Sequence, residues 1–106
     1  MLRGEIRWAD LPMPRGRRPV LLLSRDAHYP LRTAVTVAPI TRGVRNIASR
    51  VPLDEDDGMP TRSDVNLDDL LTIEKASVLE LITVLSEAKM LRVSQAIVFA
   101  LDLDMG

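Results

Sequence analysis

The sequence predicts a mainly β protein: a small β-barrel with one helix at its C-terminal end. Three observations lead to this fold class. The chain has 106 residues, which suits one domain with one core. Short apolar segments alternate with turn signals as far as residue 85. Beyond residue 86 the apolar spacing becomes that of a helix. We therefore expect a single domain over residues 1–106, built on many short strands.

The first half of the chain contains three expected strands. Residues 5–11 alternate imperfectly between apolar and polar and predict the first strand, which a loop over 12–18 follows. Residues 20–23 are apolar throughout, which predicts a strand buried on both faces. Residues 34–40 are rich in β-branched side chains and predict another buried strand. Pro39 should lie at the end of that strand or on an edge, because proline cannot donate to a ladder.

The second half contains shorter expected strands. Residues 47–53 predict a weaker strand, and residues 54–60 form an acidic turn that we interpret as a solvated loop tip. A metal site is the alternative for this turn, but its acids lack the ordered ligand frame of a calcium loop. Residues 63–67 and 70–74 are short strand candidates, and residues 79–85 predict the last strand.

A helix is expected after the last strand. Ser86 is a suitable N-cap, and Glu87 in the first turn complements the helix dipole. Apolar residues then recur at helical spacing, at Met90, Val93, Ile97 and Leu101, with Leu91 and Val98 on a second stripe. The apolar arc is wide, so we expect the helix to pack on the barrel and leave apolar surface for a dimer.

Composition excludes several kinds of site. The absence of cysteine excludes disulfides, thiolate metal ligands and cysteine nucleophiles. The single histidine, His28, cannot build a zinc site alone. No metal or cofactor is therefore expected. The first ten residues carry charges that interrupt any signal-peptide pattern, and no apolar run approaches the roughly 20 residues that span a membrane. We expect a cytoplasmic protein without a membrane partner.

The charges divide the chain into two unlike halves. Residues 1–50 carry ten basic and three acidic residues, a net charge of +7, whereas residues 51–106 carry four and twelve, a net charge of −8. All ten basic residues in the first half are arginines, which suit bidentate phosphate contacts. A genome rich in G·C pairs would also favour arginine codons, so composition alone leaves the two explanations open.

Four segments carry a resemblance to a known family. They are residues 3–6 (RGEI), 18–24 (RPVLLLS), 37–41 (VAPIT) and 63–73 (SDVNLDDLLTI). In this order and spacing they resemble the MazF/PemK family, whose corresponding patterns include RPxLxxS, PIT and SxVNLD. Each motif alone is weak, but the four together are fairly specific and cover nearly the whole chain.

The resemblance implies a fold, an activity and partners. The fold would be the homodimeric, SH3-like β-barrel of the CcdB/MazF/PemK plasmid-maintenance toxins. The activity would be metal-independent cleavage of single-stranded RNA at a short sequence, leaving 2′,3′-cyclic phosphate and 5′-hydroxyl ends. The partner would be a cognate MazE-like antitoxin whose acidic tail fills the RNA groove. The catalytic arginine and threonine of the family fall on Arg18 and Thr41.

Both residue types suit the implied chemistry. RNA supplies its own nucleophile, the 2′-hydroxyl, so the enzyme must stabilise charge and hold the attack in line. Arg18 would stabilise the phosphorane and assist the leaving oxygen; it is a poor general base because a guanidinium hardly deprotonates. Thr41 would donate a hydrogen bond to a non-bridging oxygen. The other expected RNA-binding residues are Arg15, Arg17, Arg42, Arg45, Asn66 and Asp69.

Two departures from the family bear on specificity. The loop before Arg18 is short, and Asp69 and Leu71 stand where the family carries glutamine and arginine. We therefore expect a cut site unlike that of typical relatives. Three alternatives stay open: a CcdB-like inhibitor of DNA gyrase, a MazF-like protein that binds without cutting, and an SH3-like peptide-binding module. The groove of an SH3-like peptide-binding module is lined by aromatic side chains, and this chain has only three aromatic residues.

Overall fold

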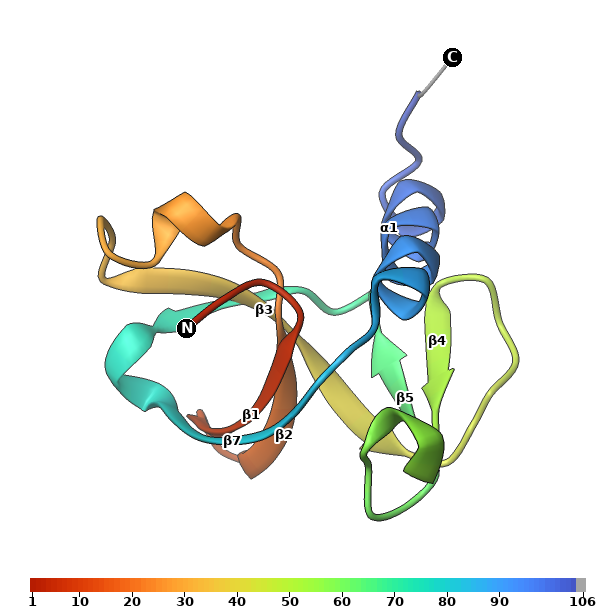
Figure 1. Ribbon diagram of the computed structural model, residues 1–106, viewed down its shortest axis with the longest axis horizontal. Helices are drawn as coiled ribbons and strands as arrows, with labels where there is room; N and C mark the ends of the chain where they lie inside the picture. The colour runs from red at the N-terminus through yellow and green to blue at the C-terminus, as the bar shows by residue number, and fades with distance from the viewer. Residues whose placement is uncertain (105–106) are drawn as a thin grey trace.

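Strand β3 organises the fold because it pairs with three other strands. The computed structural model describes residues 1–104, and in this part of the chain the sheet order is β4-β5-β3-β2-β1-β7, with β6 also on β3. The strands are β1 (Glu5–Leu11), β2 (Gly16–Leu22), β3 (Ala34–Arg42), β4 (Arg50–Leu53), β5 (Ser63–Asn66), β6 (Leu71–Glu74) and β7 (Val78–Val84). In Figure 1, β3 runs from a curled half containing β1, β2 and β7 to a half containing β4, β5 and the helix.

Two apolar clusters form the core, one on each face of the central strands. Leu21 and Ala38 belong to the cluster under the helix, whereas Val20, Leu22 and Val37 belong to the cluster enclosed by the curled half. Successive side chains of a strand point to opposite faces, so an apolar run is required where both faces are covered. The expectation that residues 20–23 are buried on both faces is confirmed.

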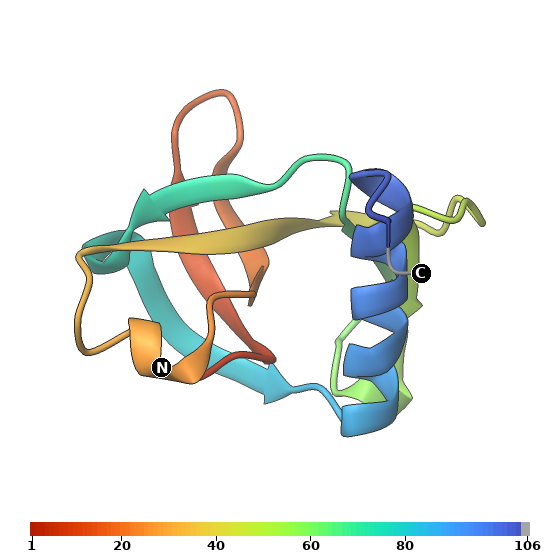
Figure 2. The same cartoon turned by 90° about the horizontal axis from the view of Figure 1, so that it is seen from above.

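Two strands begin several residues away from where they were expected. β2 begins at Gly16, so Arg17 and Arg18, expected in a loop, are strand residues opposite Asp10 and Ala9 of β1. The strand was expected to begin with its apolar residues, but the β1–β2 hairpin extends beyond them. Within β2 only the residues from Val20 onward are fully buried, so the apolar pattern does not mark the start of the strand. β4 covers Arg50–Leu53 and not the longer segment from residue 47. Seen from above, the loop between β1 and β2 stands away from the sheet (Figure 2).

Pro39 lies inside β3, not at its end, so this expectation was wrong. On one side Pro39 is opposite Val20 of β2. On its other side the pairing with β6 ends at Val37 and the pairing with β5 begins at Ile40. The missing N–H therefore falls where β3 passes from one partner to the next, and a proline is tolerated there although the strand is central.

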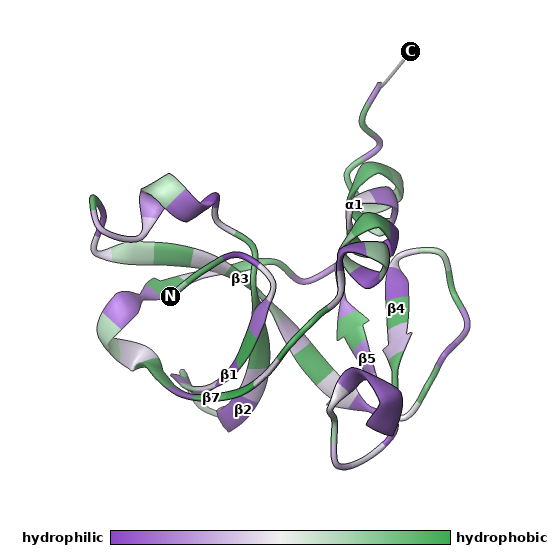
Figure 3. Ribbon diagram, in the orientation of Figure 1, coloured by the Kyte–Doolittle hydropathy of each residue, from purple (hydrophilic) through white to green (hydrophobic). Residues whose placement is uncertain are grey.

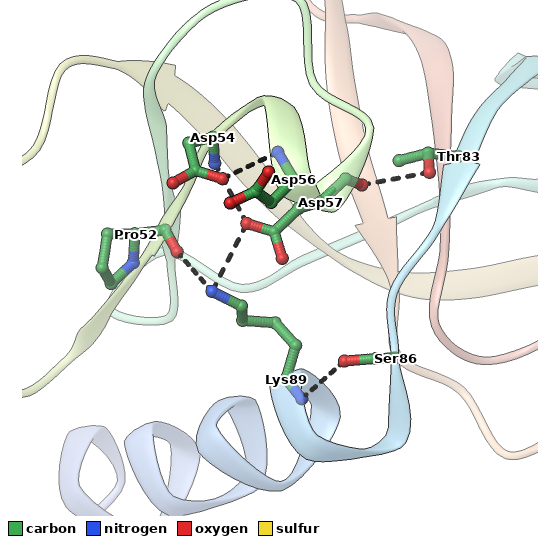
Figure 4. Close-up of polar contacts among 7 residues, drawn as sticks. All are labelled: Pro52, Asp54, Asp56, Asp57, Thr83, Ser86 and Lys89. Carbon is green, nitrogen blue, oxygen red and sulfur yellow. Dashed lines mark hydrogen bonds and ion pairs between the residues drawn. The ribbon is translucent and has the colours of Figure 1, made fainter.

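Most of the acidic turn is exposed, as expected, and it is also held in a defined conformation. η2 (Glu55–Asp57) is a 3₁₀ turn capped by Asp54, whose side chain accepts from the backbone N–H of Asp56 at 2.9 Å. Lys89 donates to the carbonyl of Pro52 at 3.1 Å and approaches the Asp57 carboxylate at 3.3 Å (Figure 4). One lysine thus joins the start of the helix to this turn and to β4. Two further 3₁₀ turns are η1 (Asp26–His28) and η3 (Lys75–Ser77).

The helix α1 (Glu87–Ala100) lies along β4 and β5 (Figure 2). Ser86 caps it as expected, since its hydroxyl accepts from the backbone N–H of Lys89 at 3.1 Å. Val93 and Ala96 are buried, but Leu91 is 61% and Phe99 63% exposed, and hydrophobic and hydrophilic residues share the helix surface (Figure 3). The expected surplus of apolar surface is present. No helix within residues 1–104 is long and apolar enough to cross a membrane.

Candidate functional site

A cleft opens where β2 and β3 diverge. Their pairing ends at Val20 and Pro39, and two residues further along each strand the same antiparallel register would place Arg18 opposite Thr41. β3 pairs instead with β5 from Ile40 onward. The space between has a volume of about 480 Å³ and is lined by Arg18 and Thr41 together. The two residues expected to act on one phosphate therefore lie in one cleft.

The walls of the cleft are strongly basic. Arg15, Arg17, Arg18 and Arg42 line it, and hydroxyls come from Thr41, Thr61 and Ser63. Trp8, Met59 and Ile82 supply apolar surface. This arrangement offers cations and hydroxyl donors to an anion and a flat apolar surface to a ring. It suits a phosphate-linked chain that carries bases.

Arg18 is held by its own hairpin. Its Nε donates to the backbone carbonyl of Arg15 at 3.1 Å, and the side chain is half-buried. Within residues 1–104 its two terminal nitrogens make no hydrogen bond or ion pair. The hairpin therefore orients the guanidinium, and its terminal donors stay available for a bidentate contact with phosphate.

Thr41 is fixed from the neighbouring strands. It lies in β3 opposite the fully buried Asp64 of β5. Its Oγ1 accepts a hydrogen bond from Nη1 of Arg50 at 3.1 Å. Sequence reasoning missed Arg50, because nothing in the sequence indicates that a β4 residue reaches across β5.

Two residues expected to bind RNA pair with each other. Arg15 forms an ion pair with Asp69, and both side chains are partly exposed. The pair joins the β1–β2 hairpin to the segment between β5 and β6. It engages the Arg15 guanidinium, at the edge of the cleft, with a carboxylate of the protein itself. Arg17 makes a looser pair with Asp10, at 3.4 Å between Nε and Oδ1. An anionic ligand would compete with both carboxylates for these arginines.

The remaining expected residues have different positions. Arg42 lines the cleft and is exposed. Arg45 and Asn66 do not line it. The backbone N–H of Arg45 donates to Oδ2 of Asp64 at 2.8 Å, and the Asn66 side chain accepts from the backbone N–H of Asp68 at 3.1 Å. Asn66 therefore holds the turn after β5, as Asn commonly does.

Trp8 is a further cleft residue that sequence reasoning missed. It pairs with Pro19 in the β1–β2 register, so it lies beside the strand that carries Arg18. The only signal available was that the one tryptophan of the chain falls in the first strand. That Trp8 lies opposite Pro19 could be known only once the register of the β1–β2 hairpin was known. Among residues 1–104, no group of three or more His, Asp or Glu side chains is placed to hold a metal ion.

Comparison with known proteins relates nearly the whole sequence to one family. A family model described as "PemK-like, MazF-like toxin of type II toxin-antitoxin system" matches residues 2–101. The probable endoribonuclease MazF5 of Mycobacterium tuberculosis H37Rv is 38% identical over 101 residues, which covers 94% of this chain and 92% of the relative. Endoribonuclease MazF3 of the same strain is 40% identical over 87 residues, covering 82% and 84%.

Solved structures give the same result for the fold. The structure of Mycobacterium tuberculosis toxin MazF-mt6 superposes with a TM-score of 0.87 at 38% identity and covers 94% of this chain and 98% of that chain. The expected barrel with a C-terminal helix is confirmed.

Proposed function

We propose that this chain, which belongs to the PemK-like, MazF-like family of type II toxins, cleaves single-stranded RNA in the cleft between Arg18 and Thr41. The observation that carries the proposal is that these two side chains, from diverging strands, line one basic cleft. Endoribonuclease relatives of matching length support the activity.

The reaction needs little from the protein beyond placement and charge. The 2′-oxygen of the ribose loses its proton to water and bonds to the adjacent phosphorus, while the bond from phosphorus to the 5′-oxygen breaks. The 5′-oxygen takes up a proton from water, so that one proton is moved from the 2′-oxygen to the 5′-oxygen overall. The products are a 2′,3′-cyclic phosphate and a 5′-hydroxyl. The Arg18 fork stabilises the charge that develops on phosphorus-bound oxygens and donates to the leaving oxygen. The Thr41 hydroxyl donates to a non-bridging oxygen.

Purified protein incubated with single-stranded RNA in EDTA tests the proposal. We expect discrete fragments and no effect on DNA supercoiling by gyrase. Cleavage that appears only when magnesium is added would contradict the metal-free mechanism. Intact RNA with inhibited gyrase would favour the CcdB-like alternative, and RNA that is bound but uncut would favour an inactive binding protein.

The partners follow from the same proposal. We propose a single domain over residues 1–106 that forms a homodimer in the cytoplasm and is neutralised by a MazE-like antitoxin. The exposed Leu91 and Phe99 on α1 support a further protein contact, since large apolar residues clustered on one helix usually have a partner. The family description as part of a toxin–antitoxin system supports the antitoxin.

Trp8 provides a direct measure of binding. It is the only tryptophan in the chain and it lines the cleft, so a bound base that stacks on the indole should change its emission. We expect saturable quenching of tryptophan fluorescence by a 2′-O-methyl RNA oligonucleotide, which can bind but cannot be cut. Unchanged emission while fluorescence anisotropy of a labelled oligonucleotide reports binding would place the RNA outside this cleft.

Removal of the Asp69 carboxylate should tighten RNA binding. Asp69→Asn releases Arg15 and removes a negative charge beside the cleft. We expect the Kd to fall by about 2- to 5-fold, the size of an exposed ion pair, in a filter-binding or anisotropy titration. The slope of log Kd against log salt should steepen by about 0.7 if Arg15 gains one phosphate. Glu74→Gln, an exposed acid on β6, is the charge-matched control. Equal effects of the two substitutions would refute a competition for Arg15.

A further inference from the structure

Arg50 reaches from β4 across β5 to the candidate site. Val51, Val65 and Ile40 are in register across β4, β5 and β3, and all three belong to the cluster under the helix. Side chains alternate between faces, so Arg50 and Thr41 lie together on the opposite face. There Nη1 of Arg50 donates to Oγ1 of Thr41 at 3.1 Å.

Arg50 forms no ion pair with any residue in the part of the chain that the structure describes. Within residues 1–104 no carboxylate lies within 4.0 Å of its guanidinium, and its Nε is buried without a hydrogen-bond partner. Asp64 lies on the same face between Thr41 and Pro52, and its Oδ2 accepts a hydrogen bond from the backbone N–H of Arg45. A partly buried cation without a partner costs solvation energy. Among residues 1–104 the polar contact of its side chain is the Thr41 hydroxyl, so the effect of Arg50 should be sought there.

We infer that Arg50 is a positioning residue that sets the direction of the Thr41 hydroxyl. This inference rests on the proposed function. A guanidinium donates hydrogen bonds and accepts none, so Thr41 must use a lone pair toward Arg50 and cannot direct its hydrogen there. The hydrogen is left for an acceptor in the cleft, which is where the phosphate oxygen would lie. A cationic donor on Oγ1 also polarises the O–H bond and strengthens its donation.

Loss of the Arg50 guanidinium should affect turnover and spare substrate affinity. For Arg50→Met we expect kcat to fall by the order of tenfold, as for the loss of one hydrogen bond to a charged group. KM should stay within about twofold, because Arg50 does not line the cleft that holds RNA. Arg50→Lys keeps a cationic donor and should lose less than Arg50→Met. Circular dichroism and melting curves confirm that each variant is folded.

A double-mutant cycle separates positioning from a direct effect on RNA. In single-turnover assays with excess enzyme, Arg50→Met should slow the wild-type protein but have no further effect in a Thr41→Ala background, because the group it positions is absent. Arg92→Met is the matched control, since Arg92 lies on α1 in the same surface groove as Arg50 and makes no contact with Thr41. It should leave kcat unchanged.

Four results would overturn the inference. A wild-type kcat for folded Arg50→Met would contradict positioning through Thr41. So would an equal loss of rate when Arg50→Met is introduced into the wild-type protein and into Thr41→Ala. Neither result would contradict the proposed nuclease activity. An effect of Arg92→Met as large as that of Arg50→Met would show that any cation in the groove suffices. If Thr41→Ala itself cleaves at the wild-type rate, the proposed role of Thr41 fails, and the inference falls with it.

Discussion

Arg18→Ala is expected to slow RNA cleavage by about 10²-fold or more, the loss typical of one removed transition-state donor. Arg18 and Arg42 are the cleft arginines that form no ion pair among residues 1–104, whereas Arg15 and Arg17 both have carboxylate partners. Arg18, unlike Arg42, is also oriented by a hydrogen bond from its Nε. Its bidentate fork can meet two phosphate oxygens at once, which a water molecule cannot replace. The measurement is single-turnover cleavage of an end-labelled RNA in EDTA.

Two controls separate this effect from general loss of charge. Arg32→Ala removes an exposed arginine just before β3. Thr41 lies near the other end of that strand, so this substitution should leave the rate unchanged. Arg18→Lys keeps the charge but not the planar fork, so it should recover only part of the activity. The melting temperature should hardly change, since Arg18 makes one side-chain hydrogen bond. A folded Arg18→Ala protein with wild-type activity would remove Arg18 from the site.

Thr41→Val is expected to be comparably damaging, with cleavage slowed by about 10²-fold. Valine keeps the shape of threonine and its preference for a strand but loses the hydroxyl donor. Arg50 also loses its acceptor at 3.1 Å, which leaves a partly buried guanidinium without that hydrogen bond. Single-turnover cleavage measures the rate, and chemical denaturation measures any accompanying loss of stability.

Thr41→Ser is the informative companion to that substitution. It restores the hydroxyl and should return most of the rate. Thr72→Val, on the exposed side of β6, is the matched control for replacing a strand threonine. If Thr41→Val and Thr41→Ser lose equal activity, the methyl group or the backbone matters and the hydroxyl does not.

Local pattern was sufficient for most of the fold. The uniform apolar run at residues 20–23 predicted a strand covered on both faces, and it lies between the two core clusters. The change of apolar period after Ser86 predicted α1, and the cap is formed by that serine. The assignment of Arg18 and Thr41 came from a family resemblance. Pattern alone describes an arginine before a proline and a threonine near a strand end, both of which are common on surfaces.

Features that depend on pairing register could not be predicted. Pro39 was expected at an end or an edge because proline cannot donate to a ladder. Its actual position, at the change of partner from β6 to β5, depends on the arrangement of the sheet. The Arg15–Asp69 pair and the Arg50–Thr41 hydrogen bond join segments 54 and 9 residues apart, and Trp8 enters the cleft through its register with Pro19. Each contact depends on which strands are neighbours, and residue spacing does not encode that.

The most direct test of the account is a single-atom change in the substrate. Once the cut site has been mapped, an RNA oligonucleotide with one 2′-deoxy nucleotide on the 5′ side of the scissile phosphate removes the nucleophile. We predict that this oligonucleotide stays uncut in EDTA, whereas the all-ribose parent yields a fragment with a 5′-hydroxyl end. Cleavage of the deoxy-substituted oligonucleotide at the parental rate, or fragments with 5′-phosphate ends, would contradict attack by the ribose on its own phosphate in the Arg18–Thr41 cleft.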